Sequence, residues 1–144
     1  MTYKHTQTSY MILFIIMILI GYFSYILISI NFDPRQAMVM FLIVFILISF
    51  TSLTLAIDNE AIQLKYGFGM IRKRFVLKNI ESVKTAINPW YYGWGIHYLP
   101  IVKIWVFNIT GRNTVEIVMK NGKKFRLGTD EPKALEQAIR NAIR

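Results

Sequence analysis

Two long stretches without a charged side chain dominate the first third of the chain. Residues 10–30 are mostly Ile, Leu, Phe and Met, and residues 37–57 form a second run of this kind. At about 1.5 Å rise per residue, helices of this length cross the roughly 30 Å hydrocarbon core of a bilayer. The sequence therefore predicts two transmembrane helices, at about residues 10–30 and 37–57.

The six residues between these runs, NFDPRQ, contain a proline and two opposite charges. A polar connection this short predicts an antiparallel helical hairpin. A cleavable signal peptide is the competing interpretation of the first run. The run exceeds the usual apolar core of about 7–15 residues and lacks a small-x-small cleavage site, so we favour a membrane span.

The distribution of basic residues predicts the orientation of the helices. Of 17 Lys and Arg residues, only Lys4 and Arg35 precede Asp58, and the connecting turn is neutral overall. Because basic segments stay on the cytoplasmic side, we expect a multi-pass protein of the inner (plasma) membrane with both termini in the cytoplasm. Neither run contains a residue charged at neutral pH, which argues against a proton relay or an ion pathway carried by this chain alone.

After Asp58 the hydrophobic period changes to two, which is typical of strands. We divide the chain into a membrane hairpin, residues 1–57, and a cytoplasmic domain, residues 58–144, whose 87 residues allow one compact core. The absence of cysteine excludes disulfides and thiolate metal sites. Strands are expected at 62–66, 71–77, 83–87, 103–109, 114–120 and 125–127, with a type I′ turn at Asn121-Gly122 and a C-terminal helix from Thr129 or Asp130 that carries Leu135, Ala138, Ile139, Ala142 and Ile143 on one face.

The stretch NPWYYGWGIHYLP, residues 88–100, contains two Pro, two Gly and five Trp or Tyr residues. This composition predicts an irregular aromatic loop instead of a strand. Trp and Tyr favour the headgroup region of a bilayer, so Trp90, Tyr91, Tyr92 and Trp94 are candidates for docking on the membrane. Packing of this loop on the domain or the second helix, or a ligand pocket, are the other interpretations.

Two strings resemble known proteins. YGFGMIRKRFVLKNIESV, residues 66–83, looks like a segment of bacterial membrane-anchored proteins with a pleckstrin-homology-like (PH-like) domain, in which a glycine turn and a basic strand precede an L-x-x-I-x-x-V run. NPWYYGWGIHY, together with residues 115–139, is similar to small bacterial two-helix membrane proteins of the same kind. The resemblance implies a PH-like antiparallel sheet or partial barrel capped by a C-terminal α-helix. It also implies binding of lipids or proteins.

Basic residues border the first predicted β-hairpin. We take Arg72, Lys73, Arg74 and Lys78 as candidates for binding anionic inner-leaflet lipids, at about 1 kcal/mol per residue near the surface. A solvated face that keeps the domain soluble is the alternative. The basic strand lacks the K-x-n-K/R-x-R pattern of phosphoinositide-binding PH domains.

Catalytic patterns are missing from the sequence. His97 has no carboxylate near it in sequence, His5 lies in the N-terminal tail, and Glu116 is expected on the solvent side of its strand. The glycines of GFGMIR precede a strand instead of a helix, which argues against a nucleotide loop. We expect a protein that is not an enzyme and uses no cofactor or metal.

The expected function is that of a membrane-anchored scaffold for inner-leaflet lipids or for a protein partner in the membrane. An accessory subunit of a larger membrane complex, such as a transporter or a secretion system, is the alternative. Nucleic-acid binding is not expected, because the aromatic residues are clustered in one segment instead of being interleaved with the basic strands.

Overall fold

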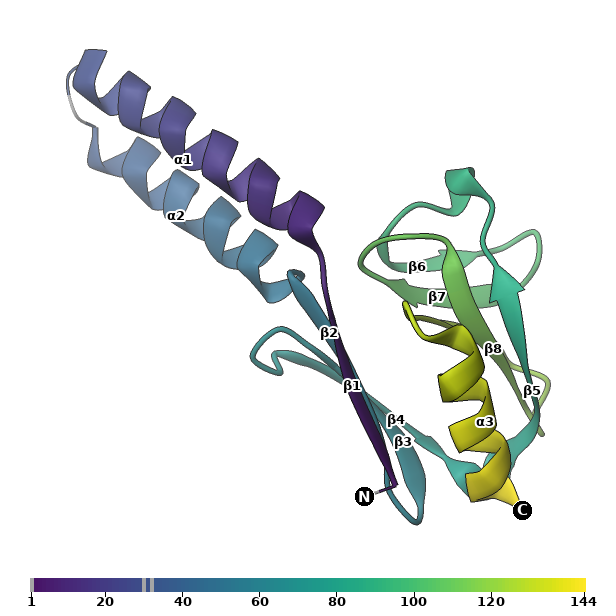
Figure 1. The fold of residues 1–144 in the computed structure, drawn as a ribbon. Helices are drawn as coiled ribbons and strands as arrows, with labels where there is room; N and C mark the ends of the chain where they lie inside the picture. Colours follow the sequence, from purple (N-terminus) through teal and green to yellow (C-terminus); the bar gives the residue numbers. More distant parts are fainter. Residues whose placement is uncertain (1, 30, 32) are drawn as a thin grey trace.

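The computed structural model describes residues 2–29, 31 and 33–144. Two helices, α1 and α2, project as a helical hairpin from one end of a β-rich domain, and both chain termini lie at the other end (Figure 1). The elements are β1 (Tyr3–Thr8), α1 (Tyr10–Ser29), α2 (Pro34–Ser49), β2 (Ser52–Ile57), β3 (Ala61–Tyr66), β4 (Ile71–Val76), η1 (Leu77–Asn79), β5 (Ile80–Ile87), η2 (Trp90–Tyr92), β6 (Gly95–Leu99), β7 (Ile104–Asn108), β8 (Asn113–Met119), β9 (Lys124–Gly128) and α3 (Pro132–Ile143).

The helical hairpin confirms the first predicted helix and corrects the second. Helix α1 has 20 residues and is long and apolar enough to cross a membrane, whereas α2 is an apolar helix of 16 residues. Asp33 caps α2 by accepting a hydrogen bond from the Arg35 amide at 2.9 Å, and Pro34 occupies the first turn. The bound at residue 57 was wrong because α2 ends at Ser49. Residue 30, the last of the first predicted helix, lies outside the described residues.

The six residues Ser52–Ile57 form strand β2 instead of the last turns of a helix. They pair with β3 on one side and with β1, an unexpected N-terminal strand, on the other, and together with β4 they make an antiparallel sheet in the order β1-β2-β3-β4. His5, expected in a tail, lies within β1. The predicted division after residue 57 would therefore separate β1 and β2 from the sheet that they form with β3 and β4.

The second sheet has five strands in the order β5-β8-β9-β7-β6. Most of its pairs are antiparallel, as expected, but β7 runs parallel to β9. Strand β6 lies at the edge, so the prediction that residues 88–100 are entirely a loop was wrong. The turn at Asn121-Gly122 was placed correctly, but only Gly122 has a positive φ, +85°. A type I′ turn needs two positive φ angles, so the predicted turn type was wrong.

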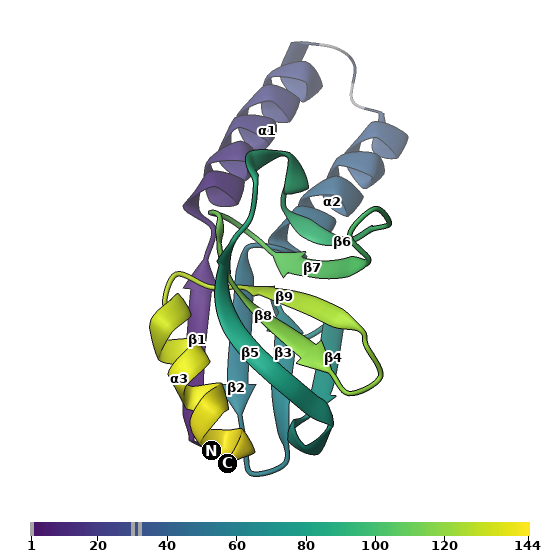
Figure 2. The ribbon, with the colours of Figure 1, turned by 90° about the vertical axis from the view of Figure 1, so that its right-hand side faces the viewer.

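The hydrophobic core lies between the two sheets, and α3 completes it. No ladder joins the sheets among the described residues, so they do not close into a barrel. Helix α3 packs against β5, β8 and β2, on the side where β1 and β5 are the outer strands (Figure 2). The predicted apolar face of α3 is confirmed, because Leu135 and Ile139 are fully buried and Ala138, Ala142 and Ile143 pack against the core. The N-cap position of α3 is Glu131, whose own side chain makes no capping bond, so the cap was predicted one or two residues too early. Thr129 Oγ1 nevertheless accepts a hydrogen bond from the Glu131 amide at 3.0 Å, just before the helix.

Candidate functional site

The turn between β3 and β4 lies against the foot of α2, where the helical hairpin meets the first sheet. Gly67 in this turn has φ +50°, and a methyl group there would stand 2.6 Å from the carbonyl oxygen of Ser49. Glycine adopts a positive φ without strain and has no side chain to collide with Ser49, so it allows the turn to touch the helix. The Phe68 ring lies 6.0 Å from the Phe45 ring. Ser49 Oγ, which donates to the Phe45 carbonyl at 3.0 Å, lies 3.5 Å from Met70 Sδ. The turn is thus packed on the last turns of α2.

Two cationic side chains flank this turn. Lys65 and Arg72 stand opposite each other in the β3–β4 ladder, and both are exposed. A methyl group at Gly69 would meet Lys65 Cε at 2.6 Å and Arg72 Nε at 2.8 Å, so both side chains lie across that glycine. Arg72 Nε also donates to the Gly69 carbonyl at 2.9 Å. Since Phe68 and Met70 are 55% and 60% exposed, the foot of α2 carries two positive charges beside two exposed apolar side chains.

The other predicted basic residues do not gather at the foot of α2, because β4 runs away from the helical hairpin (Figure 2). Lys73 is exposed on the edge strand β4, and Arg74 pairs with Glu60 at 2.9 Å. Lys78 lies in η1 and shares a surface groove with Arg144 at the chain's C-terminus. The four candidates are therefore spread along the length of the domain.

The predicted aromatic cluster is divided among three environments. Trp90 and Tyr91, in η2, are 81% and 68% exposed. The ribbon between β5 and β6, which contains η2, lies at the end of the domain that carries the helices (Figure 2). The ring of Tyr92 lies beneath the Arg126 guanidinium, 5.5 Å from its carbon. Trp94 lines a groove at the foot of the helical hairpin. These residues belong to the second sheet and its connections, whereas Arg72 belongs to the first.

A buried polar network fastens the aromatic segment to the second sheet. Glu116 is 4% exposed, so its predicted place on the solvent side was wrong. Its carboxylate accepts from Arg126 Nε at 3.0 Å and lies 3.5 Å from Lys84 Nζ. Arg126 also donates to Asn88 Oδ1 at 2.9 Å, just before η2. Because the charge of Glu116 is paired and hydrogen-bonded, the network has a structural explanation.

His97 is not paired through Nε2 with any second side chain among the described residues. Its Nε2 is buried and makes no hydrogen bond with the described residues. A general base would need a proton donor or acceptor within about 3 Å. His97 lies on β6, opposite Val106 of β7.

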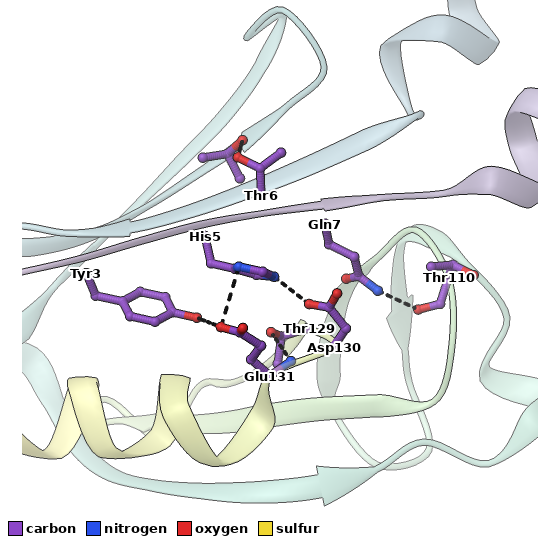
Figure 3. A network of polar contacts seen from close by, with 9 residues as sticks. Tyr3, His5, Thr6, Gln7, Thr110, Thr129, Asp130 and Glu131 are labelled. Atoms are coloured by element: carbon purple, nitrogen blue, oxygen red, sulfur yellow. Dashed lines mark hydrogen bonds and ion pairs between the residues drawn. The ribbon is translucent and has the colours of Figure 1, made fainter.

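A second polar cluster, which the sequence analysis missed, joins β1 to the start of α3 (Figure 3). His5 Nε2 lies 2.5 Å from Asp130 Oδ1, and His5 Nδ1 lies 3.4 Å from Glu131 Oε2. Tyr3 donates to the same Glu131 oxygen at 3.4 Å. Burial, reinforced by the negative charge of Glu131, raises the pKa of Tyr3 to about 12. Both ring nitrogens of His5 face carboxylates, so His5 links β1 to the residues at the start of α3.

The sequence YKHTQT of β1 contains one signal that could have predicted this cluster, namely side chains that alternate between the two faces of a strand. Tyr3, His5 and Gln7 point to the domain interior, whereas Lys4, Thr6 and Thr8 are exposed. That period of two is typical of a strand, although its inward residues are polar. Within residues 2–29, 31 and 33–144, no group of three His, Asp or Glu side chains is arranged to hold a metal ion.

Comparisons with known proteins give no relative on which to base a function. No protein-family model, curated protein or solved structure matches the chain. What the protein does is therefore inferred from its own residues.

Proposed function

We propose that this protein is a non-catalytic, membrane-anchored PH-like module that presents the foot of its helical hairpin to anionic lipids of the inner leaflet. In this proposal both helices cross the membrane, and the β-rich domain and both termini lie in the cytoplasm. The bound lipid is recognised by its phosphate and by the start of its acyl chains. The module serves as a scaffold at that surface.

The exposed helical hairpin supports the membrane anchor. Helix α1 exposes apolar side chains around most of its surface, and Ile16 is its only buried residue among those described. An apolar helix without a polar face is stable in lipid and costly in water. Strand β1 pairs with β2 along its whole length, so cleavage behind α1 would remove a strand of the sheet, which argues against a signal peptide.

The order of elements supports the PH-like relationship. Antiparallel strands precede a C-terminal helix that covers the core from one side, as the resemblance implies. The two separate sheets depart from the partial barrel of such domains. The proposed relationship therefore rests on the element order and on the quoted strings.

The observation that carries the proposal is the packing of the β3–β4 turn on α2. Phe45 and Ser49 of the helix hold Phe68 and Met70, and Lys65 and Arg72 lie immediately behind them. If α2 crosses the membrane, its last turns lie at the headgroup level. Apolar side chains can then enter the acyl region while the two cations meet lipid phosphates, which is the arrangement that interfacial segments use.

The test uses the full chain purified in a mild detergent. Native mass spectrometry would compare retention of phosphatidylglycerol with that of phosphatidylcholine. We expect a preference for phosphatidylglycerol that falls about 30-fold in Lys65→Gln/Arg72→Gln, because each cation contributes about 1 kcal/mol near anionic lipid. The matched control is Lys78→Gln/Arg144→Gln, which removes the same charge at the other end of the domain.

Equal lipid preference in the wild type and in Lys65→Gln/Arg72→Gln would contradict the proposed lipid contact. Co-purification of a stoichiometric membrane protein in that case would favour the accessory-subunit function. A loss of the preference for phosphatidylglycerol in Lys78→Gln/Arg144→Gln alone would place the lipid contact at the end of the domain away from the helices, which would also contradict the proposal.

A further inference from the structure

An apolar groove lies between the foot of the helical hairpin and the second sheet. Its volume is about 350 Å³, and its walls come from both helices, from β6 and β7, and from the residues just after α2, just before β6 and just after β7. Ile12 belongs to the first turn of α1, and Leu47 belongs to the last turn of α2. The remaining side chains used below are Phe50, Trp94, Ile96 and Ile109.

The main polar side chain of the groove already has its hydrogen bonds within the protein. This side chain is Asn108, and Trp94 adds a single indole N–H to a lining that is otherwise apolar. Asn108 Oδ1 accepts from the Ile109 amide at 2.9 Å, and Asn108 Nδ2 donates to the Gly111 carbonyl at 3.0 Å. A ligand that carried hydrogen-bonding groups into the groove would lose contacts with water and find few partners, which is costly. The groove therefore selects an apolar occupant.

The place of the groove indicates which apolar molecule can reach it. The groove opens toward the apolar surface of the hairpin, because the groove-lining Ile12 and Leu47 lie one helical turn from Ile15 and Ile43, which are 40% and 39% exposed. A flexible chain lying beside the helices can thus enter without crossing a charged surface. Resting on the proposed membrane anchoring, we propose that the groove binds one acyl chain of a membrane lipid, with the chain packed between Leu47 and the Trp94–Ile96 edge of β6.

Trp94 provides a direct test, because it lines the groove and is 53% exposed. Trp90→Phe/Trp105→Phe leaves Trp94 as the single tryptophan of the full chain. The protein would be reconstituted into vesicles of phosphatidylcholine brominated in the middle of the acyl chain, since bromine quenches tryptophan fluorescence on contact. We expect the fluorescence of Trp94 to fall at least twofold relative to vesicles without bromine.

Two variants separate an occupied groove from general proximity to the membrane. Trp94→Phe/Trp105→Phe retains Trp90, which is 81% exposed and lies outside the groove, and its fluorescence should fall much less. Adding Ile96→Phe to the Trp94 protein narrows the groove and should restore at least half of the lost fluorescence. Equal quenching of Trp90 and Trp94, or no recovery with Ile96→Phe, would overturn the acyl-chain site.

A reporter within α1 separates failure of the groove from failure of the anchor. Tyr22→Trp in a chain whose three tryptophans are replaced by Phe should be quenched strongly if α1 crosses the membrane. Quenching of this reporter without quenching of Trp94 would reject the acyl-chain site and retain the membrane anchor. The same result is expected if a second copy of the chain or a partner helix fills the groove. Quenching of neither would reject both.

Discussion

The pairing of β1 and β2 predicts that residues 58–144 do not fold alone. Strand β2 stands between β1 and β3, and it contributes Leu53, Leu55 and Ile57 to the core at 1%, 3% and 0% exposure. Full burial of such side chains contributes about 1.5–3 kcal/mol each, so deleting β2 removes roughly 5–9 kcal/mol. Because a domain is stable by only about 5–15 kcal/mol, and β1 and its contacts with α3 are lost as well, the fragment should be unfolded.

The matched variant keeps both strands and removes the helical hairpin. Ser9 donates from its amide to the Thr51 carbonyl at 2.7 Å, so these two residues are paired at the end of the β1–β2 ladder. An Asn-Gly turn can join them in place of residues 10–50, because two-residue turns of this kind fit the twist of antiparallel strands. We expect this shortened chain to be soluble and folded, although it loses the contact between the Phe50 and Tyr66 rings.

Circular dichroism, urea unfolding and amide NMR spectra of the two proteins would test this reasoning. The shortened chain should give dispersed amide signals and a cooperative unfolding transition, and the 58–144 fragment should give neither. A cooperatively folded fragment would refute the claim that β2 is essential to the core. An unfolded shortened chain would show that the two strands do not complete the domain without the helices.

Two further predictions concern the polar clusters. In Glu116→Ala, the half-buried Arg126 keeps its hydrogen bond to Asn88 but loses its anionic partner. The free energy of unfolding of the full chain in detergent should therefore fall by about 3 kcal/mol, and Glu116→Leu/Arg126→Met should recover most of that loss. Equal losses in the two variants would contradict a structural role for the pair. The folded-state pKa of Tyr3, about 12, lies above the ordinary value of 10.0, so the protonated form of Tyr3 favours folding. The stability advantage of the wild type over Tyr3→Phe should therefore shrink as pH rises from 10 to 12, and urea unfolding at each pH would measure it. An advantage that does not change with pH would reject this linkage.

The sequence predicted those elements whose signals are local. The β3–β4 hairpin, with its alternation and its glycine turn, was confirmed within one residue at each strand, and the helix Pro132–Ile143 was confirmed with its apolar face. Both patterns repeat over several turns or positions, so one segment holds all of the information. The charge-free run that starts at Tyr10 was equally clear, and it is a helix over Tyr10–Ser29.

The elements that were missed depend on distant partners. SLTLAI is uncharged and follows an apolar helix directly, so hydropathy extends the helix through it. Its β-branched and alternating residues form a strand because YKHTQT, more than forty residues earlier, pairs with it. Likewise, nothing local distinguishes Glu116 from a solvent-facing glutamate. Its burial results from Arg126 and Lys84 on the neighbouring strands.

The candidate site was predicted only in part, for a related reason. The sequence grouped Arg72, Lys73, Arg74 and Lys78 because they are close in the chain, but an extended strand followed by a helical turn carries them from one end of the domain to the other. Lys65, seven residues before Arg72, becomes its neighbour through the β3–β4 ladder. Strand pairing, and not the density of charge along the chain, decides which cations act together.

The insertion of the helices between two paired strands has a consequence for binding. A domain tethered by one flexible linker samples many orientations and loses that freedom when it docks on a membrane. Here the chain enters the helices from β1 and leaves them into β2, and the Ser9–Thr51 hydrogen bond and the packing of Gly67 on Ser49 fix the junction from two sides. Under the proposed topology, the β3–β4 turn and the apolar groove are held at the headgroup level before any lipid binds. A weak contact from two cations and one acyl chain is then sufficient, because the orientation has already been set by the fold.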